Sequence, residues 1–231
     1  MYIKFVIIAS NYFENLLSIF FKKMQSNLDR LFHNIKKEGP LLKDDDPNAI
    51  LEFQEEWQRR ELFVKKYSWA VPSKEVINKI VEFIDNDKCL ETGSGAGLWA
   101  YLLQQYNVDI IATDKKTTVY NYYYTDVETL SDKDAMEKYN GKNTLLVCWS
   151  VTNPTTSFKG NKIVYIGDRR KEYGCTDGEP DENEWELVEK VQLSNWIYIR
   201  DFLAFYRRKS NKAVILISIC AIIIFSQIIL Y

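Results

Sequence analysis

The sequence predicts an α/β fold with a doubly wound sheet that is mostly parallel and closes with an antiparallel hairpin. Between residues 88 and 168, short apolar runs alternate with helical patterns, which is typical of parallel strands joined by helices. Two further runs, 184–193 and 200–209, follow each other without a helix between them, as in a hairpin. With 231 residues, the chain is long enough for one such domain with appendages.

Four helices are expected around this core. One covers residues 49–67, and the next covers 74–84, where Ser73 can cap the first turn with its hydroxyl. Apolar residues recur on one side of the second helix, at Val76, Ile77, Ile80, Val81 and Ile84. The other two helices are predicted at 98–106 and 131–139, the last beginning at Ser131.

The strands are short and follow the helices in turn. We expect strands at 88–92, 108–114, 144–149 and 162–168. The last two runs are apolar almost throughout, which indicates strands buried on both faces. Ahead of the domain, residues 33–50 are charged and contain two prolines, so they are interpreted as a linker within a helix-and-linker segment at 24–48. The domain itself is expected to cover 49–209.

The C-terminal residues 213–231 carry no charge. As a helix they would span about 28 Å, close to the hydrocarbon thickness of a bilayer. Arg207, Arg208, Lys209 and Lys212 precede them, and basic clusters of this kind stay cytoplasmic. We therefore expect a transmembrane tail anchor with the domain facing the cytosol; the alternative is a buried C-terminal helix.

The N-terminal residues 1–23 are apolar with a polar stripe that includes Glu14. A membrane-spanning helix would tolerate that acid poorly. Two interpretations remain open. The segment is either an amphipathic helix on a membrane surface or on the domain, or an upstream extension with Met24 as the natural start.

Composition excludes several classes of function. The net charge of -2 argues against a general nucleic-acid binder, so no nucleic-acid partner is expected. The four cysteines form no C-x-x-C pair, and neither a disulfide framework nor a metal site is expected. The single histidine, His33, lies in a polar stretch and is interpreted as a surface residue. Composition does not predict the oligomeric state.

The segment "ETGSGAG", residues 91–97, places three of the nine glycines between a strand and a helix. Glycines let the backbone turn sharply and approach a ligand closely. The third glycine, Gly97, comes one position earlier than in the G-x-G-x-x-G dinucleotide pattern, and we expect its amide to face the ligand. Glu91 precedes the turn and Asp114 ends the next strand, where a carboxylate can accept both hydroxyls of a ribose.

These segments resemble the first two motifs of class I S-adenosylmethionine-dependent methyltransferases, in which the pattern is acid-x-Gly-x-Gly-x-Gly. That family has a Rossmann-like fold whose seventh strand runs antiparallel, like the predicted hairpin. A closer resemblance, over about residues 55–209, is to a poorly characterised methyltransferase-like group. It rests on an ordered series: "YSWAVP" at 67–72, "LWAYLL" at 98–103, "LLVCW" at 145–149, "GNKIVYIG" at 160–167 and "GCT" at 174–176.

The resemblance implies S-adenosylmethionine as cofactor. It would place the methionine part and sugar of the cofactor against Glu91 and the backbone of Gly93, Ser94, Gly95 and Gly97. Asp114 would hold the ribose hydroxyls. Residues 120–124, "YNYYY", would either cover the adenine or receive a substrate, or simply pack on the sheet edge.

The segment "CWSVTNPT", residues 148–155, departs from the related pattern "CWPPY". The two prolines and the aromatic platform are replaced by Ser150, Val151 and Thr152. No general-base constellation is evident, and Trp149, Ser150 and Asp126 are the weak candidates for the catalytic side of the pocket. The expected function is a membrane-tethered methyltransferase acting on a small-molecule, lipid-derived or protein acceptor. The alternatives are an inactive nucleoside-binding module and a membrane-displayed interaction domain.

Overall fold

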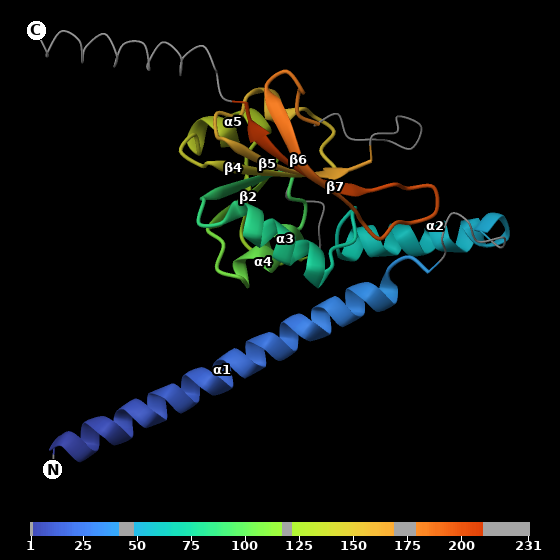
Figure 1. The fold of residues 1–231 in the computed structure, drawn as a ribbon. Helices are drawn as coiled ribbons and strands as arrows, with labels where there is room; N and C mark the ends of the chain where they lie inside the picture. The colour runs from blue at the N-terminus through green and yellow to red at the C-terminus, as the bar shows by residue number, and fades with distance from the viewer. Residues whose placement is uncertain (1, 42–48, 117–121, 169–178, 210–231) are drawn as a thin grey trace, which may run out of the picture.

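A computed structural model describes residues 2–41, 49–116, 122–168 and 179–209 of the chain (Figure 1). The elements, in order, are α1 (Tyr2–Glu38), α2 (Ala49–Lys66), α3 (Lys74–Ile84), β1 (Cys89–Thr92), α4 (Leu98–Gln104), β2 (Ile110–Asp114), β3 (Val127–Thr129), α5 (Asp132–Lys138), β4 (Thr144–Cys148), the 3-10 helix η2 (Pro154–Thr156), β5 (Lys162–Gly167), β6 (Trp185–Gln192) and β7 (Phe202–Arg208). The predicted helices and strands of the domain are confirmed with bounds that differ by a few residues. The short edge strand β3 was not predicted.

The strands form one sheet in the order β3-β2-β1-β4-β5-β7-β6. All neighbours from β3 to β5 pair in parallel, whereas β7 pairs antiparallel with both β5 and β6. This is a Rossmann-like sheet, and its antiparallel C-terminal hairpin confirms the prediction. Because the order reverses between β1 and β4, the carboxyl ends of β1, β2 and β4 meet at the switch point of the sheet, where such folds bind ligands.

Helices cover both faces of the sheet (Figure 1). The larger core joins α3, α4 and part of α1 to one face and includes Leu146 and Val164. The smaller core joins α5 to the other face and includes Leu145 and Ile163. Successive residues of β4 and β5 therefore point into different cores, as expected for strands buried on both faces.

Helix α3 shows why the predicted bounds were accurate. Ser73 has an extended backbone, and its hydroxyl accepts a hydrogen bond from the amide of Val76 at 3.2 Å. The buried side of the helix follows the predicted period, with Val76, Ile77, Ile80 and Ile84 in the core. Ser131 caps α5 in the same way through the amide of Asp134.

The predicted linker at 33–50 is wrong for its first residues, because α1 continues without a break to Glu38. The linker was predicted from the charged residues and the two prolines of this segment. The last turns are instead held to the domain by buried Leu28 and Ile35, and Asp29 pairs with Lys74 at 3.4 Å.

Within the described ranges, no helix is both long and apolar enough to cross a bilayer. The predicted membrane segment at 213–231 lies outside the residues that the structure describes. The division into 1–23, 24–48 and 49–209 stays a prediction.

Candidate functional site

The glycine turn links β1 to α4 and adopts left-handed backbone angles. The φ values are +64° at Gly93, +57° at Gly95 and +74° at Gly97, a region that residues with a Cβ enter only at a cost. An added Cβ at Gly93 would have nothing within 4 Å, so space around this residue is open. The turn is tied to β2, because the Ser94 amide donates to the carbonyl of Thr113 at 3.0 Å.

Asp114 at the end of β2 holds the turn in place. Its Oδ2 accepts the amide hydrogen of Gly95 at 2.9 Å, and its Oδ1 accepts that of Lys116 at 2.7 Å. A carboxylate has about four acceptor positions, so two remain for a ligand. The side chain is half-buried and borders a cavity, which puts these remaining positions where a pair of hydroxyls could reach them.

Glu91 is fully buried on β1, between Ala112 of β2 and Leu146 of β4. Its Oε2 accepts the amide hydrogen of Ala100 in α4 at 3.1 Å, while Oε1 has no hydrogen-bond partner among the described residues. Burial raises the pKa of Glu91 to about 8, helped by the charge of Asp114 and opposed by the Ala100 hydrogen bond. At neutral pH the acid is therefore mostly protonated. A buried polar atom without a partner is uncommon, and this makes Oε1 a candidate contact for a ligand.

Both acids border one cavity of about 560 Å³ at the carboxyl ends of β1, β2 and β4. Its volume falls in the range of small-molecule sites. Of the predicted cofactor residues, Glu91, Gly93, Ser94, Gly95 and Asp114 line it. Of the weak catalytic candidates, Trp149 and Ser150 line it from the other side. Two distant segments of the chain are thus brought to one cavity.

Gly97 and Asp126 do not border this cavity. The amide of Gly97 donates to the carbonyl of Ser94 at 2.9 Å, so the prediction that it faces the ligand is wrong. A Cβ at Gly97 would lie 2.9 Å from the side chains of Thr125 and Val127, which shows that the residue lets α4 pack closely beside β3. Asp126 borders a separate hollow of about 360 Å³ at the β2–β3 edge, because β3 lies at the edge of the sheet.

Trp149, directly after β4, has a left-handed backbone with φ of +52°. Such a conformation is uncommon for a bulky residue and persists only where the surroundings enforce it. The indole Nε1 donates to Oδ1 of buried Asp201 at 2.7 Å, and the ring stacks on Trp69 with centroids 5.5 Å apart. Arg60 lies over both indoles, at 5.2 Å from Trp69 and 5.6 Å from Trp149.

Sequence reasoning missed Arg60 and Asp201. Arg60 is 5% exposed, and burial lowers the pKa of its guanidinium while the charge of Asp201 opposes that shift. Cation–π contact with three tryptophans, including Trp57 at 5.1 Å, compensates part of the lost hydration. No spacing in the sequence links α2 to the segment before β7, so no sequence signal was available.

In the loop after Trp149, hydrogen bonds from hydroxyl groups stand where the related pattern "CWPPY" has two prolines. The Ser150 hydroxyl lies 3.0 Å from that of Thr152 and also accepts the Thr152 amide hydrogen at 3.2 Å. The Thr152 hydroxyl donates to Asp132 at the start of α5. The loop therefore has a defined shape, although it lacks the Pro-Pro-aromatic platform.

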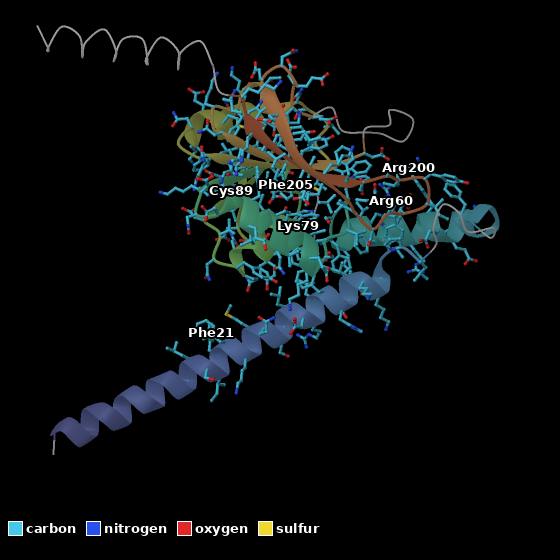
Figure 2. All side chains as sticks on the ribbon, viewed as in Figure 1. Phe21, Arg60, Lys79, Cys89, Arg200 and Phe205 are labelled. Atoms are coloured by element: carbon cyan, nitrogen blue, oxygen red, sulfur yellow. The ribbon has the colours of Figure 1, made fainter. Side chains whose placement is uncertain are left out.

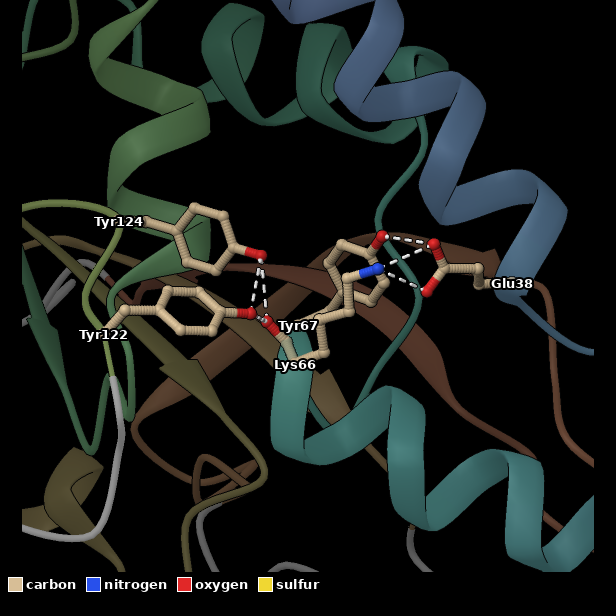
Figure 3. Close-up of polar contacts among 5 residues, drawn as sticks. All are labelled: Glu38, Lys66, Tyr67, Tyr122 and Tyr124. Atoms are coloured by element: carbon tan, nitrogen blue, oxygen red, sulfur yellow. Dashed lines mark hydrogen bonds and ion pairs between the residues drawn. The ribbon is translucent and has the colours of Figure 1, made fainter.

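A third wall of the cavity is formed by residues 67–69, which lie between α2 and α3. Lys66 at the end of α2 donates to both carboxylate oxygens of Glu38 in α1 at 2.7 Å, and Tyr67 donates to the same carboxylate at 3.1 Å (Figure 3). Tyr122 and Tyr124 donate to the carbonyl of Lys66. These two tyrosines thus fasten the end of α2 and do not line the cavity; residues 120 and 121 lie outside the described ranges.

No protein-family model and no curated protein matches the sequence. Solved structures similar to the chain include the N-methyltransferase NodS from Bradyrhizobium japonicum, in complex with S-adenosyl-L-homocysteine, at 12% identity and a TM-score of 0.46 over 71% of this chain and 100% of that one. A second is 1,6-didemethyltoxoflavin-N1-methyltransferase from Burkholderia thailandensis, with bound S-adenosylhomocysteine, at 7% identity and a TM-score of 0.47 over 74% and 93%.

A third is the Pyrococcus abyssi tRNA (uracil-54, C5)-methyltransferase, also in complex with S-adenosyl-L-homocysteine, at 15% identity and a TM-score of 0.42. The match covers 57% of this chain and 37% of that protein.

Proposed function

We propose that the chain binds S-adenosylmethionine in the cavity at the carboxyl ends of β1, β2 and β4 and acts as a methyltransferase. The observation that carries the proposal is the pair of acids at this cavity. Among the described residues, one buried oxygen of Glu91 has no hydrogen-bond partner, Asp114 keeps acceptor positions that no protein group uses, and an open turn of glycines lies between the two acids. The family resemblance of this turn and of the segments after it supplies the identity of the cofactor.

Three residues at the carboxyl ends of β1 and β2 would then contact the cofactor. Asp114 accepts the ribose hydroxyls with the acceptor positions that Gly95 and Lys116 leave free. Gly93, without a side chain and with open space around it, allows the backbone to approach the ligand. Glu91 Oε1 receives the ammonium group of the methionine part, which satisfies the buried oxygen.

S-adenosylmethionine supplies an electrophilic methyl group. Transfer to an acceptor atom that is already nucleophilic needs alignment more than acid–base help. Trp149 and Trp69 provide an aromatic wall at the opposite side of the cavity, and Ser150 adds a polar group there. We propose a small-molecule or lipid-derived acceptor that lies against this wall.

Calorimetry on the full chain with S-adenosylmethionine and S-adenosylhomocysteine tests the proposal. Asp114→Asn should weaken binding about 5- to 150-fold, because a buried ribose loses a charged acceptor worth about 1–3 kcal/mol. Asp126→Asn is the matched control, since Asp126 lies at a different hollow and should leave affinity unchanged. Absence of binding at millimolar ligand would leave only the interaction-domain alternative.

Turnover distinguishes the enzyme from a silent binding module. Labelled cofactor is incubated with the chain and a membrane extract, and transfer of label to any acceptor is followed. Label transfer that is lost in Asp114→Asn supports the enzyme. Tight binding without transfer across broad extracts supports the inactive nucleoside-binding module.

We further propose that residues 213–231 anchor the chain in a membrane with the domain in the cytosol. The uncharged sequence of this segment and the basic residues before it support the proposal. Arg208 also has a structural task, because it donates to the carbonyls of Gly160 and Phe158. If the chain leaves the membrane fraction on washing with alkaline carbonate, the anchor is ruled out.

A further inference from the structure

Residues 16–21 of α1 present large apolar side chains to solvent. The exposed fractions are 48% for Leu16, 39% for Leu17, 58% for Ile19, 58% for Phe20 and 60% for Phe21. Figure 1 shows this end of α1 extending past the domain, and Figure 2 shows Phe21 on the extended part. Contiguous exposed apolar groups of this size mark an interaction surface.

This surface continues the side of α1 that already packs on the domain. Leu28, Leu31 and Ile35 contact the larger core, at the alternating spacing of three and four residues that keeps one helix face. The same spacing, counted back from Leu28, reaches Phe21 and Leu17. The helix therefore runs beyond the domain with its apolar face still uncovered among the described residues.

The uncovered face is wider than a seam between two helices. At about 100° per residue, residues 16, 17, 19, 20 and 21 cover an arc of about 200°. A two-stranded coiled coil uses a narrower stripe, so a second copy of α1 would leave Ile19 and Phe20 exposed. Ser18, Lys22, Gln25 and Ser26 lie on the remaining side, all exposed. A broad apolar arc with a polar back is typical of a helix that lies in a lipid interface.

Charge points to the same partner. Lys22 and Lys23 are exposed directly after the apolar residues, and the sequence has no acidic residue between Glu14 and Asp29. Lysines beside an apolar helix face attract anionic headgroups. A generic apolar pocket on a protein would give no reason for this local excess of positive charge.

We propose that residues 16–23 of α1 form a docking surface for an anionic lipid bilayer, with Leu16, Phe20 and Phe21 entering the interface and Lys23, which lies between Ile19 and Leu16 around the helix, contacting headgroups. This contact is separate from the proposed C-terminal anchor and from methyl transfer. It would hold the domain against the bilayer through its N-terminal helix.

The test places an environment-sensitive nitrobenzoxadiazole label on one position of α1 in the full chain. Phe20→Cys puts the label on the apolar arc, and Ser18→Cys puts it on the polar back as the matched control. Cys175 and Cys220 are replaced by serine, while the buried Cys89 and Cys148 are retained. Emission is compared without vesicles, with vesicles of phosphatidylcholine, and with vesicles of phosphatidylcholine that contain about 30 mol% phosphatidylserine and so carry a negative surface potential.

The expected result is a blue shift and brightening of the label at position 20 on anionic vesicles, with the label at position 18 remaining water-like. Because the readout is local to α1, it does not depend on whether the chain reaches the vesicle through its C-terminal segment or binds a cofactor. No shift at position 20, or an equal shift at both positions, overturns the proposal. A shift that needs no vesicles and grows with chain concentration identifies a second copy as the partner and also overturns it.

Charge variants supply the second measurement. Lys23→Gln should lower the ratio of docked to free α1 on anionic vesicles about fivefold. Lys36→Gln and Lys37→Gln change the same charge on the same helix and should have little effect. An equal effect of Lys36→Gln or Lys37→Gln would show non-specific attraction and contradict a local surface.

Discussion

Replacing Glu91 by glutamine should remove most of the pH dependence of stability that we expect of the native chain between pH 4.5 and 8. The carboxyl group is fully buried, and burial raises its pKa from 4.5 to about 8. In the unfolded chain the group ionises near its ordinary value. Between the two values, the folded state keeps a proton that the unfolded state has released.

The sign and size follow from this difference. Because the folded state binds more protons, the free energy of unfolding is highest below pH 4.5, falls as pH rises and levels off above pH 8. The pKa difference, 8 − 4.5, is about 3.5, and each step of one corresponds to about 1.4 kcal/mol. The native chain should therefore lose up to about 5 kcal/mol across this window through Glu91 alone.

Urea denaturation, followed by tryptophan fluorescence at several pH values, measures the effect. Glutamine keeps an oxygen for the amide of Ala100 and carries no charge, so the Glu91→Gln curve should be flatter than the native one by most of that amount. Asp109→Asn neutralises an exposed acid and should follow the native curve. Parallel native and Glu91→Gln curves from pH 5 to pH 8 would refute the assignment of a neutral buried Glu91.

Three further outcomes are expected. Binding of S-adenosylmethionine should release protons near pH 7, because a cation beside Glu91 lowers its pKa; calorimetry in buffers of different ionisation enthalpy detects this, and Glu91→Gln should abolish it. Gly97→Ala should lower the free energy of unfolding by about 2–4 kcal/mol, because the alanine would have both a left-handed backbone and close contacts with Thr125 and Val127. Gly93→Ala should lower it by only about 1 kcal/mol, because an added Cβ there has nothing within 4 Å. Equal shifts in the melting temperatures of the two variants would contradict this reasoning. Trp149→Phe removes the indole N–H that donates to Asp201 and should lower the free energy of unfolding by about 1–3 kcal/mol. An unchanged midpoint of urea denaturation would contradict a stabilising role for this hydrogen bond.

Much of the fold could be predicted from the sequence because its signals are local. The cap at Ser73, the apolar period of α3 and the continuous apolar runs of β4 and β5 each lie within a few residues. The glycine turn and the acid at the end of β2 were likewise readable, because parallel strands bring their carboxyl ends to one edge. Glu91, Gly93, Ser94, Gly95 and Asp114 all lie at or directly after the carboxyl ends of β1 and β2, so this rule places all five at the cavity.

The remaining features depend on contacts between segments far apart in the chain. Arg60 and Asp201 meet at Trp149 only through the tertiary fold, and no pattern in the sequence connects them. Gly97 was predicted to face the ligand because Gly93 and Gly95 belong to the same turn. A glycine is instead required there because the side chain of Thr125, on another segment, leaves no room for a Cβ. The end of α1 was interpreted as a linker because its charges are visible in the sequence and the core residues that hold it are not.

Tyr67 lines the cavity and also holds Glu38 of α1, next to the ion pair made by Lys66. The long N-terminal helix and the wall of the pocket therefore share an anchor point. Moving this end of α1 would therefore displace a side chain that forms part of the cavity wall.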